Sequence, residues 1–171
     1  MEDRHEGQTE ETRLVNELRK AIEHRATWMY NLLKEARKRG LEWDDFAREA
    51  VRETGCFHGQ LRREKMEDPS SLREFSTVFA AGTSRDVFEM EVLEADEERY
   101  YLDFHYCPLV SAWEKQGAST EEIEHLCDIA MDGDRGIASR FPAFKFTLGK
   151  TLAQGHPVCQ IRFDKKDPES E

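Results

Sequence analysis

The sequence predicts an α+β fold: an antiparallel four-stranded sheet from two hairpins, packed with several helices that include a long N-terminal helix. Two observations carry this prediction. Apolar residues recur at three- and four-residue spacing up to residue 82, and from residue 86 they alternate with polar residues. Two hairpins on either side of a helical insert then give the sheet, with the helices packed on it. At 171 residues, the chain is expected to form a single domain, residues 1–171.

The helical part spans residues 10–82 and follows a polar segment, residues 1–9, that we expect to be disordered. A long amphipathic helix is predicted over residues 10–39, because apolar residues recur there at helical spacing. Gly40 stands where a C-terminal cap is expected. The apolar stripe of this helix belongs either to the core or to a homodimer interface, and the sequence leaves both interpretations open.

Two further helices are predicted before the sheet. The first begins near Glu42, and two aspartates in its first turn favour the helix dipole. Residues 55–69 predict a helix with an interruption. Another helix is expected to start at Ser70 or Ser71 and to stop at Gly82.

The core of the predicted α+β fold lies in residues 85–165 and begins with a hairpin. Apolar and acidic side chains alternate over residues 86–92, which indicates a half-buried strand. A polar turn at residues 95–98 leads to a second strand over residues 100–106. Pro108 then opens a short helix, since proline suits the first helical position.

A helical insert separates this hairpin from a second one. The short helix ends at Gly117, and the sequence Ser119–Glu122 is a capping box that starts the next helix. Residues 144–152 and 158–163 are predicted to be the strands of the second hairpin, with a tip at residues 153–156.

The composition excludes several classes of function. Charged residues make up 36% of the chain and the net charge is −11, so an acidic surface would repel phosphate and no nucleic-acid partner is expected. A membrane helix needs about 18 consecutive apolar residues, and none occur. The N-terminus is polar, unlike a signal peptide, so we expect no membrane partner and a cytoplasmic location. There the cysteines would stay reduced: Cys56, Cys107, Cys127 and Cys159.

Three of these cysteines stand in distinctive local sequences. A Cys-Pro follows a predicted strand at Cys107, and a Leu-Cys lies on a helix twenty residues later at Cys127. The pattern Thr-x-x-x-Gly-x-x-x-Cys runs from Thr151 through Gly155 to Cys159. In this order and setting, the three motifs resemble the L-2-amino-thiazoline-4-carboxylic acid hydrolase family over residues 85–165.

The resemblance implies a hydrolase that opens a small heterocycle containing sulfur and nitrogen. Attack at the amidine-like C2 carbon of a ring like 2-aminothiazoline-4-carboxylate would give an N-carbamoyl amino acid. The resemblance also implies that Thr151 and Cys159 line the substrate pocket, and Cys127 and Asp128 are further substrate-binding candidates. The chain departs from the family pattern at Gln160, where many members have an acid.

The second strand suggests a catalytic group. Asp103, His105 and Cys107 fall on one strand face, although same-face neighbours are about 6.6–7 Å apart, too far for direct hydrogen bonds. As the N-cap before Pro108, Cys107 would meet the positive end of a helix dipole, which favours a nucleophilic thiolate. A water molecule with His105 or a carboxylate as base is the alternative nucleophile. Asp103 and His105 could equally form a polar outer face, and Cys107 could be structural.

Other charged residues offer further roles. Asp128, Asp132 or Asp134 could act as a general base if burial raised its pKa, or they could form a solvated face. A substrate carboxylate needs a cation, for which the sequence offers four candidates without choosing among them: Arg135, Lys145, Lys150 and Arg162.

The alternative from another class is a non-catalytic sensor domain, related to 4-vinyl-reductase-type domains, that binds a small ligand or a metal. Zinc could in principle be held by the cysteines with His58 or His105. No Cys-x-x-Cys pair is present, however, so no metal and no other cofactor is expected.

Overall fold

The computed structural model describes residues 9–166. Disorder was predicted for residues 1–9. Residues 1–8 lie outside the part of the chain that the structure describes. In chain order the elements are α1 (Glu10–Lys38), α2 (Asp44–Arg63), α3 (Leu72–Phe79), α4 (Ser84–Phe88), β1 (Met90–Ala95), β2 (Arg99–Phe104), α5 (Pro108–Lys115), α6 (Thr120–Ala130), α7 (Asp132–Ala138), β3 (Phe144–Leu148), the 3₁₀ turn η1 (Leu152–Gln154) and β4 (Cys159–Lys165).

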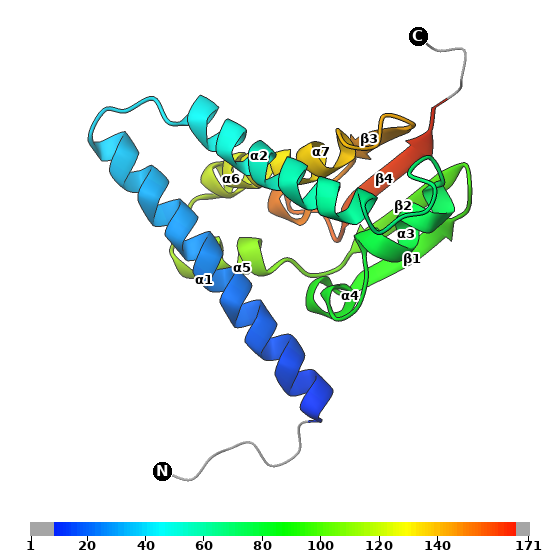
Figure 1. The fold of residues 1–171 in the computed structure, drawn as a ribbon. Helices are drawn as coiled ribbons and strands as arrows, with labels where there is room; N and C mark the ends of the chain where they lie inside the picture. Colours follow the sequence, from blue (N-terminus) through cyan, green and yellow to red (C-terminus); the bar gives the residue numbers. More distant parts are fainter. Residues whose placement is uncertain (1–8, 167–171) are drawn as a thin grey trace.

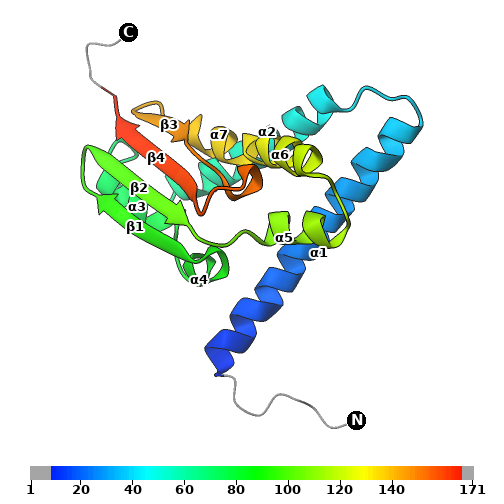
Figure 2. The same ribbon diagram turned by 180° about the vertical axis from the view of Figure 1, so that it is seen from behind.

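The four strands form one antiparallel sheet in the order β1-β2-β4-β3, which confirms the α+β prediction. Helix α3 covers one face of the sheet (Figure 1), and the opposite face is turned toward the viewer in Figure 2. The long helices α1 and α2 lie beside the sheet. They are joined at one end by a loop and point away from each other from there (Figure 1). None of the helices in the described part is both long and apolar enough to cross a membrane.

The sheet buries an aromatic core against α3. Phe75 is fully buried, and its ring lies 4.7 Å from that of Phe141 and 4.9 Å from that of Phe163. Tyr100 and Leu102 on β2 point to the same side and are also buried. Alternation along β2 and β4 therefore directs the apolar face toward α3, as the period of two predicts.

A second core lies among the helices. Trp113 of α5 is fully buried, and its indole Nε1 donates a hydrogen bond of 3.1 Å to the Ala26 carbonyl of α1. Tyr30 and Leu33 pack in the same cluster, together with Leu126 of α6. The inner face of α1 is thus buried in this core.

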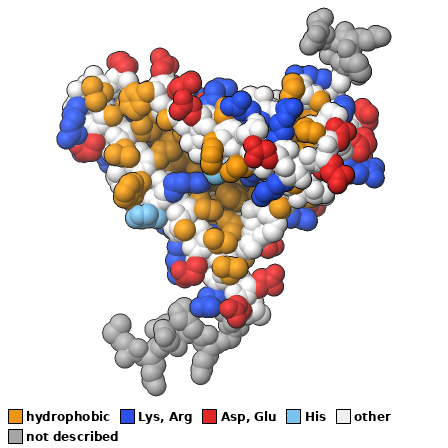
Figure 3. Space-filling view, viewed as in Figure 1, with side chains coloured by type: hydrophobic (Ala, Val, Ile, Leu, Met, Phe, Trp, Pro, Cys, Tyr) orange, Lys and Arg blue, Asp and Glu red, His pale blue; other side chains and the backbone are white. Residues whose placement is uncertain are grey.

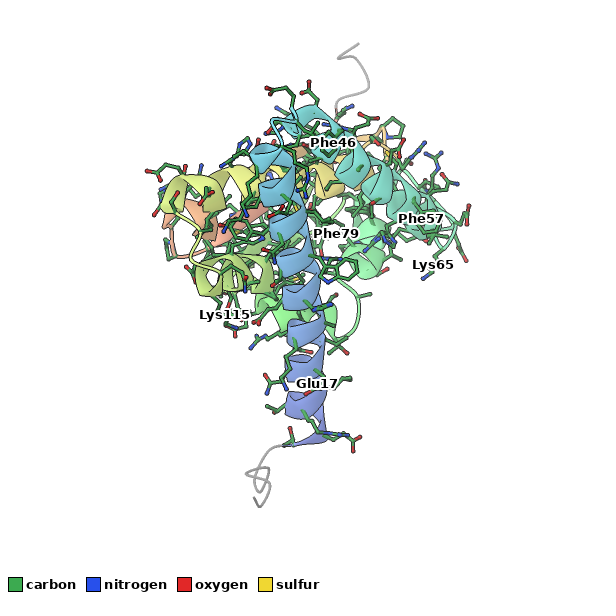
Figure 4. All side chains as sticks on the ribbon, turned by 90° about the vertical axis from the view of Figure 1, so that its left-hand side faces the viewer. Glu17, Phe46, Phe57, Lys65, Phe79 and Lys115 are labelled. Carbon is green, nitrogen blue, oxygen red and sulfur yellow. The ribbon has the colours of Figure 1, made fainter. Side chains whose placement is uncertain are left out.

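The other apolar stripe of α1 faces solvent in the monomer. Leu14, Leu18, Trp28 and Leu32 are between 37% and 65% exposed. In the view of Figure 4, α1 lies in front of α2, and the labelled Phe46 lies on α2. The homodimer interpretation of this helix therefore stays a prediction.

Helices α2 and α7 approach so closely that only glycine fits between them. A Cβ added to Gly55 would lie 2.0 Å from the Gly133 carbonyl oxygen, and one added to Gly136 would lie 2.3 Å from the Arg52 carbonyl oxygen. A Cβ on Gly59, one turn along α2, would lie 2.9 Å from the backbone of α7. The two backbones are therefore in direct contact over about one helical turn.

A buried carboxylate reinforces this contact. Asp132, at the start of α7, is 1% exposed and is bound by three arginines. Arg52 donates to it at 2.5 Å and Arg48 at 3.1 Å, while a nitrogen of Arg135 lies 3.4 Å away. Pairing with arginines compensates the burial of the ionised carboxylate, so the network favours one alignment of α2 and α7.

One helical prediction is corrected by this contact. Helix α2 continues to Arg63 without the interruption predicted within residues 55–69, because its glycines face α7 rather than breaking the helix. The helical insert also contains α7, which the sequence did not predict as a separate helix and whose first turn begins at Asp132.

The strand boundaries also differ from prediction. The strand expected over residues 86–92 begins only at Met90, and Phe88 ends α4 instead. Glu89 links the two elements with a φ of 49°, in the left-handed region. Apolar and acidic residues alternate in the sequence through this short helix and the left-handed residue after it. The alternation therefore wrongly predicted that the strand starts at residue 86.

The second hairpin is shorter than predicted. Strand β3 ends at Leu148 rather than at residue 152, and Thr151 caps η1 through its hydroxyl, which accepts from the Gln154 N–H at 3.3 Å. Strand β2 likewise ends at Phe104 rather than at residue 106.

We expect Gly55→Ala to lower the free energy of unfolding by about 3 kcal/mol or more, because a methyl group cannot be accommodated between two backbones without moving a helix. The measurement is chemical denaturation. Gly117→Ala is the control: its φ of 75° strains alanine, but no atom lies within 4 Å, so a loss of only about 1 kcal/mol is expected. Equal losses in both variants would contradict the close-contact account.

Candidate active site

Between α1 and α2 the surface is hollowed. Figure 3, in the orientation of Figure 1, shows a depression there with hydrophobic side chains inside it and basic side chains at its edge. The segment that connects β2 to α5 is visible through the opening between the two helices (Figure 1). Cys107 ends this segment and packs, only partly buried, against the helical core, as do Met29, Val51 and Met131.

Cys107 is the N-cap of α5 and Pro108 occupies the first turn, as predicted. The expected lowering of its thiol pKa is wrong. Burial raises the pKa of Cys107, and the N–H groups of Leu109 and Val110 only partly oppose this effect. The thiol closes no capping hydrogen bond. In the resting protein Cys107 is therefore a neutral thiol that needs a base before it can act as a nucleophile.

Asp134 of α7 is the buried acid of this region. It lies in the interior although part of its surface stays accessible, and burial raises its pKa from 3.8 to about 6. The charges of Arg62 and Arg135 act to lower this pKa but do not overcome the burial. The negative charge of Asp134 in turn raises the pKa of Cys107 and of Cys127. The charge of Asp134 thus acts on these thiols, and a pKa of about 6 suits a general base that works near neutral pH.

Arg62 of α2 is a half-buried cation whose pKa is affected by the charge of Asp134. Its Nε is buried and has no hydrogen-bond partner, while its Nη1 donates to the His58 carbonyl at 3.2 Å. Burial lowers the pKa of Arg62, and the charge of Asp134 raises it. No ion pair joins Arg62 to Asp134 among the described residues, although the charge of each acts on the pKa of the other.

The other predicted catalytic residues lie elsewhere. Asp103 forms an ion pair of 2.6 Å with Arg162 on the neighbouring strand, and His105 forms one of 3.0 Å with Glu91. The predicted common face of Asp103, His105 and Cys107 is therefore wrong. Strand β2 ends before His105, so the alternation no longer holds where the chain turns into α5.

The predicted substrate-binding residues do come together. Cys127, Asp128 and Thr151 line one surface pocket of about 450 Å³ between α6 and η1. Cys159 lies beside it, where its sulfur accepts from the Leu152 N–H at 3.2 Å and burial raises its pKa to about 11. Burial also raises the pKa of Cys127 well above its ordinary range.

This pocket is poorly suited to an anionic ligand. Glu121, Glu124 and Asp128 line it, and the lining cation Arg135 is paired with Asp128 at 2.7 Å. Burial acts to raise the pKa of Asp128, but its hydrogen bonds to Arg135 and Arg48 lower it overall. Asp128 is thus a paired, ionised carboxylate rather than a base.

The cation candidates from the sequence are also engaged or distant. Arg135 pairs with Asp128 and Asp132, and Arg162 pairs with Asp103, whereas Lys145 is exposed on β3. Lys150 is also exposed.

Arg62 was missed because the helix was expected to be interrupted there. In an unbroken helix the spacing of Gly55, Gly59 and Arg62 places all three on one face, which was the available signal.

Over residues 9–166, no group of three or more histidine, cysteine, aspartate or glutamate side chains has an arrangement that could hold a metal ion. His58 and Cys56 lie on α2, whereas the other three thiols lie around α5, α6 and β4.

Comparison with known proteins identifies the family. The family model described as L-2-amino-thiazoline-4-carboxylic acid hydrolase matches residues 19–163. The chain belongs to this family. The match includes α2 and α7 as well as the three cysteine motifs, so both Asp134 and Arg62 lie within it. Membership supports hydrolase activity at the level of the family.

A solved structure shares the fold. A trafficking protein particle complex subunit 3 from Naegleria fowleri, covalently bound to palmitic acid, matches with a TM-score of 0.55 and 14% identity. The match covers 85% of this chain and 95% of that chain. At this identity the likeness concerns the fold alone. No curated protein matches the sequence.

Asp134→Asn is expected to stabilise the protein at pH 7. Because folding raises this pKa, stability falls as the pH rises from the ordinary value of 3.8 through about 6, and above that the full penalty applies. At about 1.4 kcal/mol per pKa unit, the penalty is ~3 kcal/mol. Denaturation at pH 7 and at pH 4.5 should show a gain that shrinks with acidity. The exposed Asp45→Asn variant should change stability by less than about 0.5 kcal/mol. A loss of stability at pH 7 for Asp134→Asn would contradict the assignment.

The three buried thiols should react slowly with iodoacetamide at pH 7, because the thiolate is the reacting species and burial raises all three pKa values. Peptide mass spectrometry would follow Cys107, Cys127 and Cys159, with the same reaction in guanidinium chloride as the control. Selective, fast labelling of Cys107 in the folded protein would restore the thiolate prediction.

Proposed function

We propose that the protein hydrolyses a small heterocycle containing sulfur and nitrogen, with attack at the amidine-like carbon of a ring like 2-aminothiazoline-4-carboxylate. The observation that carries this proposal is Asp134, whose pKa of about 6 suits a general base and whose charge acts on the thiol of Cys107. Family membership supports the reaction class.

In the proposed reaction, Cys107 Sγ attacks the carbon between the ring sulfur and the two nitrogens, and its proton passes to the Asp134 carboxylate. The bond between that carbon and the ring sulfur then breaks, and the ring sulfur takes the proton. Water next attacks the same carbon while Asp134 accepts its proton, and the bond to Cys107 breaks. Return of the proton to Cys107 completes the cycle. The net change is the addition of one water, which gives an N-carbamoyl amino acid with a free thiol.

The raised pKa of Cys107 affects how its proton is transferred in the first step of the reaction. Transfer of its proton to Asp134 is energetically uphill before attack, so the transfer must accompany formation of the new bond. Asp134 must be ionised to accept the proton. Activity should therefore rise as the pH increases through about 6.

A binding function is the second candidate. The depression between α1 and α2 contains hydrophobic side chains (Figure 3), and burial raises the pKa of the thiols of Cys107, Cys127 and Cys159, which keeps them neutral at pH 7. The fold is that of a protein whose structure contains covalently bound palmitic acid. In this alternative one of the thiols holds or contacts an apolar ligand, and no turnover occurs. Native mass spectrometry of the purified protein would reveal such a ligand as added mass.

The ring-opening proposal predicts that the wild-type protein releases one thiol per molecule of 2-aminothiazoline-4-carboxylate opened, which chromatography with mass detection can follow. Cys107→Ser and Asp134→Asn should each lower kcat/KM by about 100-fold or more, since both groups act on the reacting carbon. Cys56→Ser, which alters a thiol of α2 that lies 3.5 Å from Ser139 Oγ, is the matched control and should retain activity.

Two outcomes would change the assignment. Full activity of Cys107→Ser with loss of activity in Asp134→Asn would make an activated water the nucleophile. Absence of any ring opening by the wild-type protein, together with a copurified acyl ligand, would favour the binding function.

A further inference from the structure

Helix α1 exposes a stripe of six side chains along most of its length. The spacing of these positions alternates between four and three residues, as the a and d positions of a coiled coil do. All six are exposed, and they are Leu14, Leu18, Ala21, Arg25, Trp28 and Leu32. At 1.5 Å per residue the stripe is about 27 Å long. Tyr30 and Leu33, on another side of α1, are buried in the helical core, so the stripe is a separate face that the monomer leaves uncovered.

The stripe is complementary to a second copy of itself. A rotation by 180° about an axis beside Glu23 places each of its positions opposite another of its positions. The opposed pairs are Leu14 with Leu32, Leu18 with Trp28 and Ala21 with Arg25. In two of these pairs a large side chain meets a smaller one. A two-fold interface requires one surface patch that fits itself, and the stripe has this property.

The charges of α1 favour the same antiparallel arrangement. The first turn of the helix carries Glu10 and Glu11, and the last turn carries Arg37 and Lys38. In an antiparallel pair, the acidic first turn of each copy lies beside the basic last turn of the other, and the helix dipoles are also opposed. Parallel helices would instead bring like charges together.

Helix α1 is also the part of this acidic chain that repels a second copy least. The whole chain has a net charge of −11, whereas Glu10–Lys38 contains seven lysine and arginine residues and five glutamates. A contact built on α1 therefore avoids much of the repulsion between two acidic molecules.

The exposed apolar surface on α1 and α2 is large enough for a dimer. A leucine or aromatic side chain presents roughly 200 Å² when fully exposed, so the four large apolar members of the stripe, at 37–65% exposure, contribute about 400 Å². Phe46, Phe57 and Leu61 of α2 are 41–62% exposed and add about 300 Å². Figure 3 shows hydrophobic side chains in the depression between these two helices. The total approaches the ~800 Å² that each partner buries in a standard interface.

We propose that two copies of this chain form a two-fold dimer in which the α1 helices pair antiparallel through the stripe. The partner helix lies beside the depression, so the exposed apolar side chains of α2 complete the interface. Arg25 fixes the register, because a shift by one heptad would place it against Leu14 or Trp28 instead of Ala21. This inference does not depend on the proposed function.

Sedimentation velocity of the full chain measures the mass of the species in solution. Each chain has a mass of 20.0 kDa, and the wild-type protein should sediment with twice that mass. Leu18→Glu should raise the Kd of the dimer by about 100-fold or more, because it buries a carboxylate opposite Trp28. Leu93→Glu is the matched control, since Leu93 is 47% exposed on β1 and lies outside the interface. Circular dichroism of each variant separates loss of the dimer from loss of the fold.

Ala21 tests the orientation and register of the two helices. Because the antiparallel pair places it opposite Arg25, Ala21→Glu should lower the Kd by about threefold, whereas Ala21→Arg should raise it by about tenfold or more. Ala21 is exposed in the monomer, so neither variant should unfold the protein.

Three outcomes would overturn the proposal. The first is a wild-type protein that stays monomeric at its highest soluble concentration, and the second is a dimer that Leu18→Glu leaves intact. The third is an equal effect of Ala21→Glu and Ala21→Arg, which would mean that the helices do not pair antiparallel in this register. A dimer that Leu18→Glu dissociates, with opposite effects of the two Ala21 variants, supports the proposal whether or not the protein opens a thiazoline ring.

Discussion

The contact between α2 and α7 is the constraint on which the candidate site depends. Glycines let the two backbones touch, with the Gly55 position only 2.0 Å from the Gly133 carbonyl oxygen if a Cβ were present. Asp132 and its arginines lock the alignment. Arg62 follows the α2 glycines on the same helix face, and Asp134 lies between the two α7 glycines. Arg62 and Asp134 thus lie on the two helices that this packing joins, and the charge of each acts on the pKa of the other.

The residues of the candidate site lower the stability of the folded protein. Burying Asp134 raises its pKa and so penalises the ionised form, and the Nε of Arg62 has lost water without gaining a partner. By contrast, Asp103, Asp128 and Asp132 all have cationic partners. Local departures from good pairing are expected at functional sites, where a ligand rather than the protein supplies the missing partner. This contrast is the physical reason for placing the chemistry at Asp134 and not at the better-paired acids.

The sequence predicted most of the fold but less of the site. Period-two alternation located the antiparallel sheet, and the Cys-Pro pair correctly placed Cys107 at an N-cap. What failed depends on tertiary contacts. The N-cap position alone indicates a low thiol pKa, but burial by residues far along the chain reverses the direction. Gly55 and Gly59 suggested an interrupted helix because a single sequence does not reveal the partner against which they pack. Asp134 was one of three candidate acids in the sequence, and the structure distinguishes it because Asp128 and Asp132 are paired with arginines while burial raises the pKa of Asp134.

The account depends most directly on the ionisation of Asp134. Carbon-13 NMR of the aspartate carboxyl groups, with Asp134→Asn to assign the resonance, would follow its titration in the full chain. The account predicts a midpoint at about pH 6, displaced upward from 3.8 by burial. A midpoint near 4 would mean that Asp134 is solvated or closely paired. It would then be an ordinary surface acid, and the general-base assignment would be wrong.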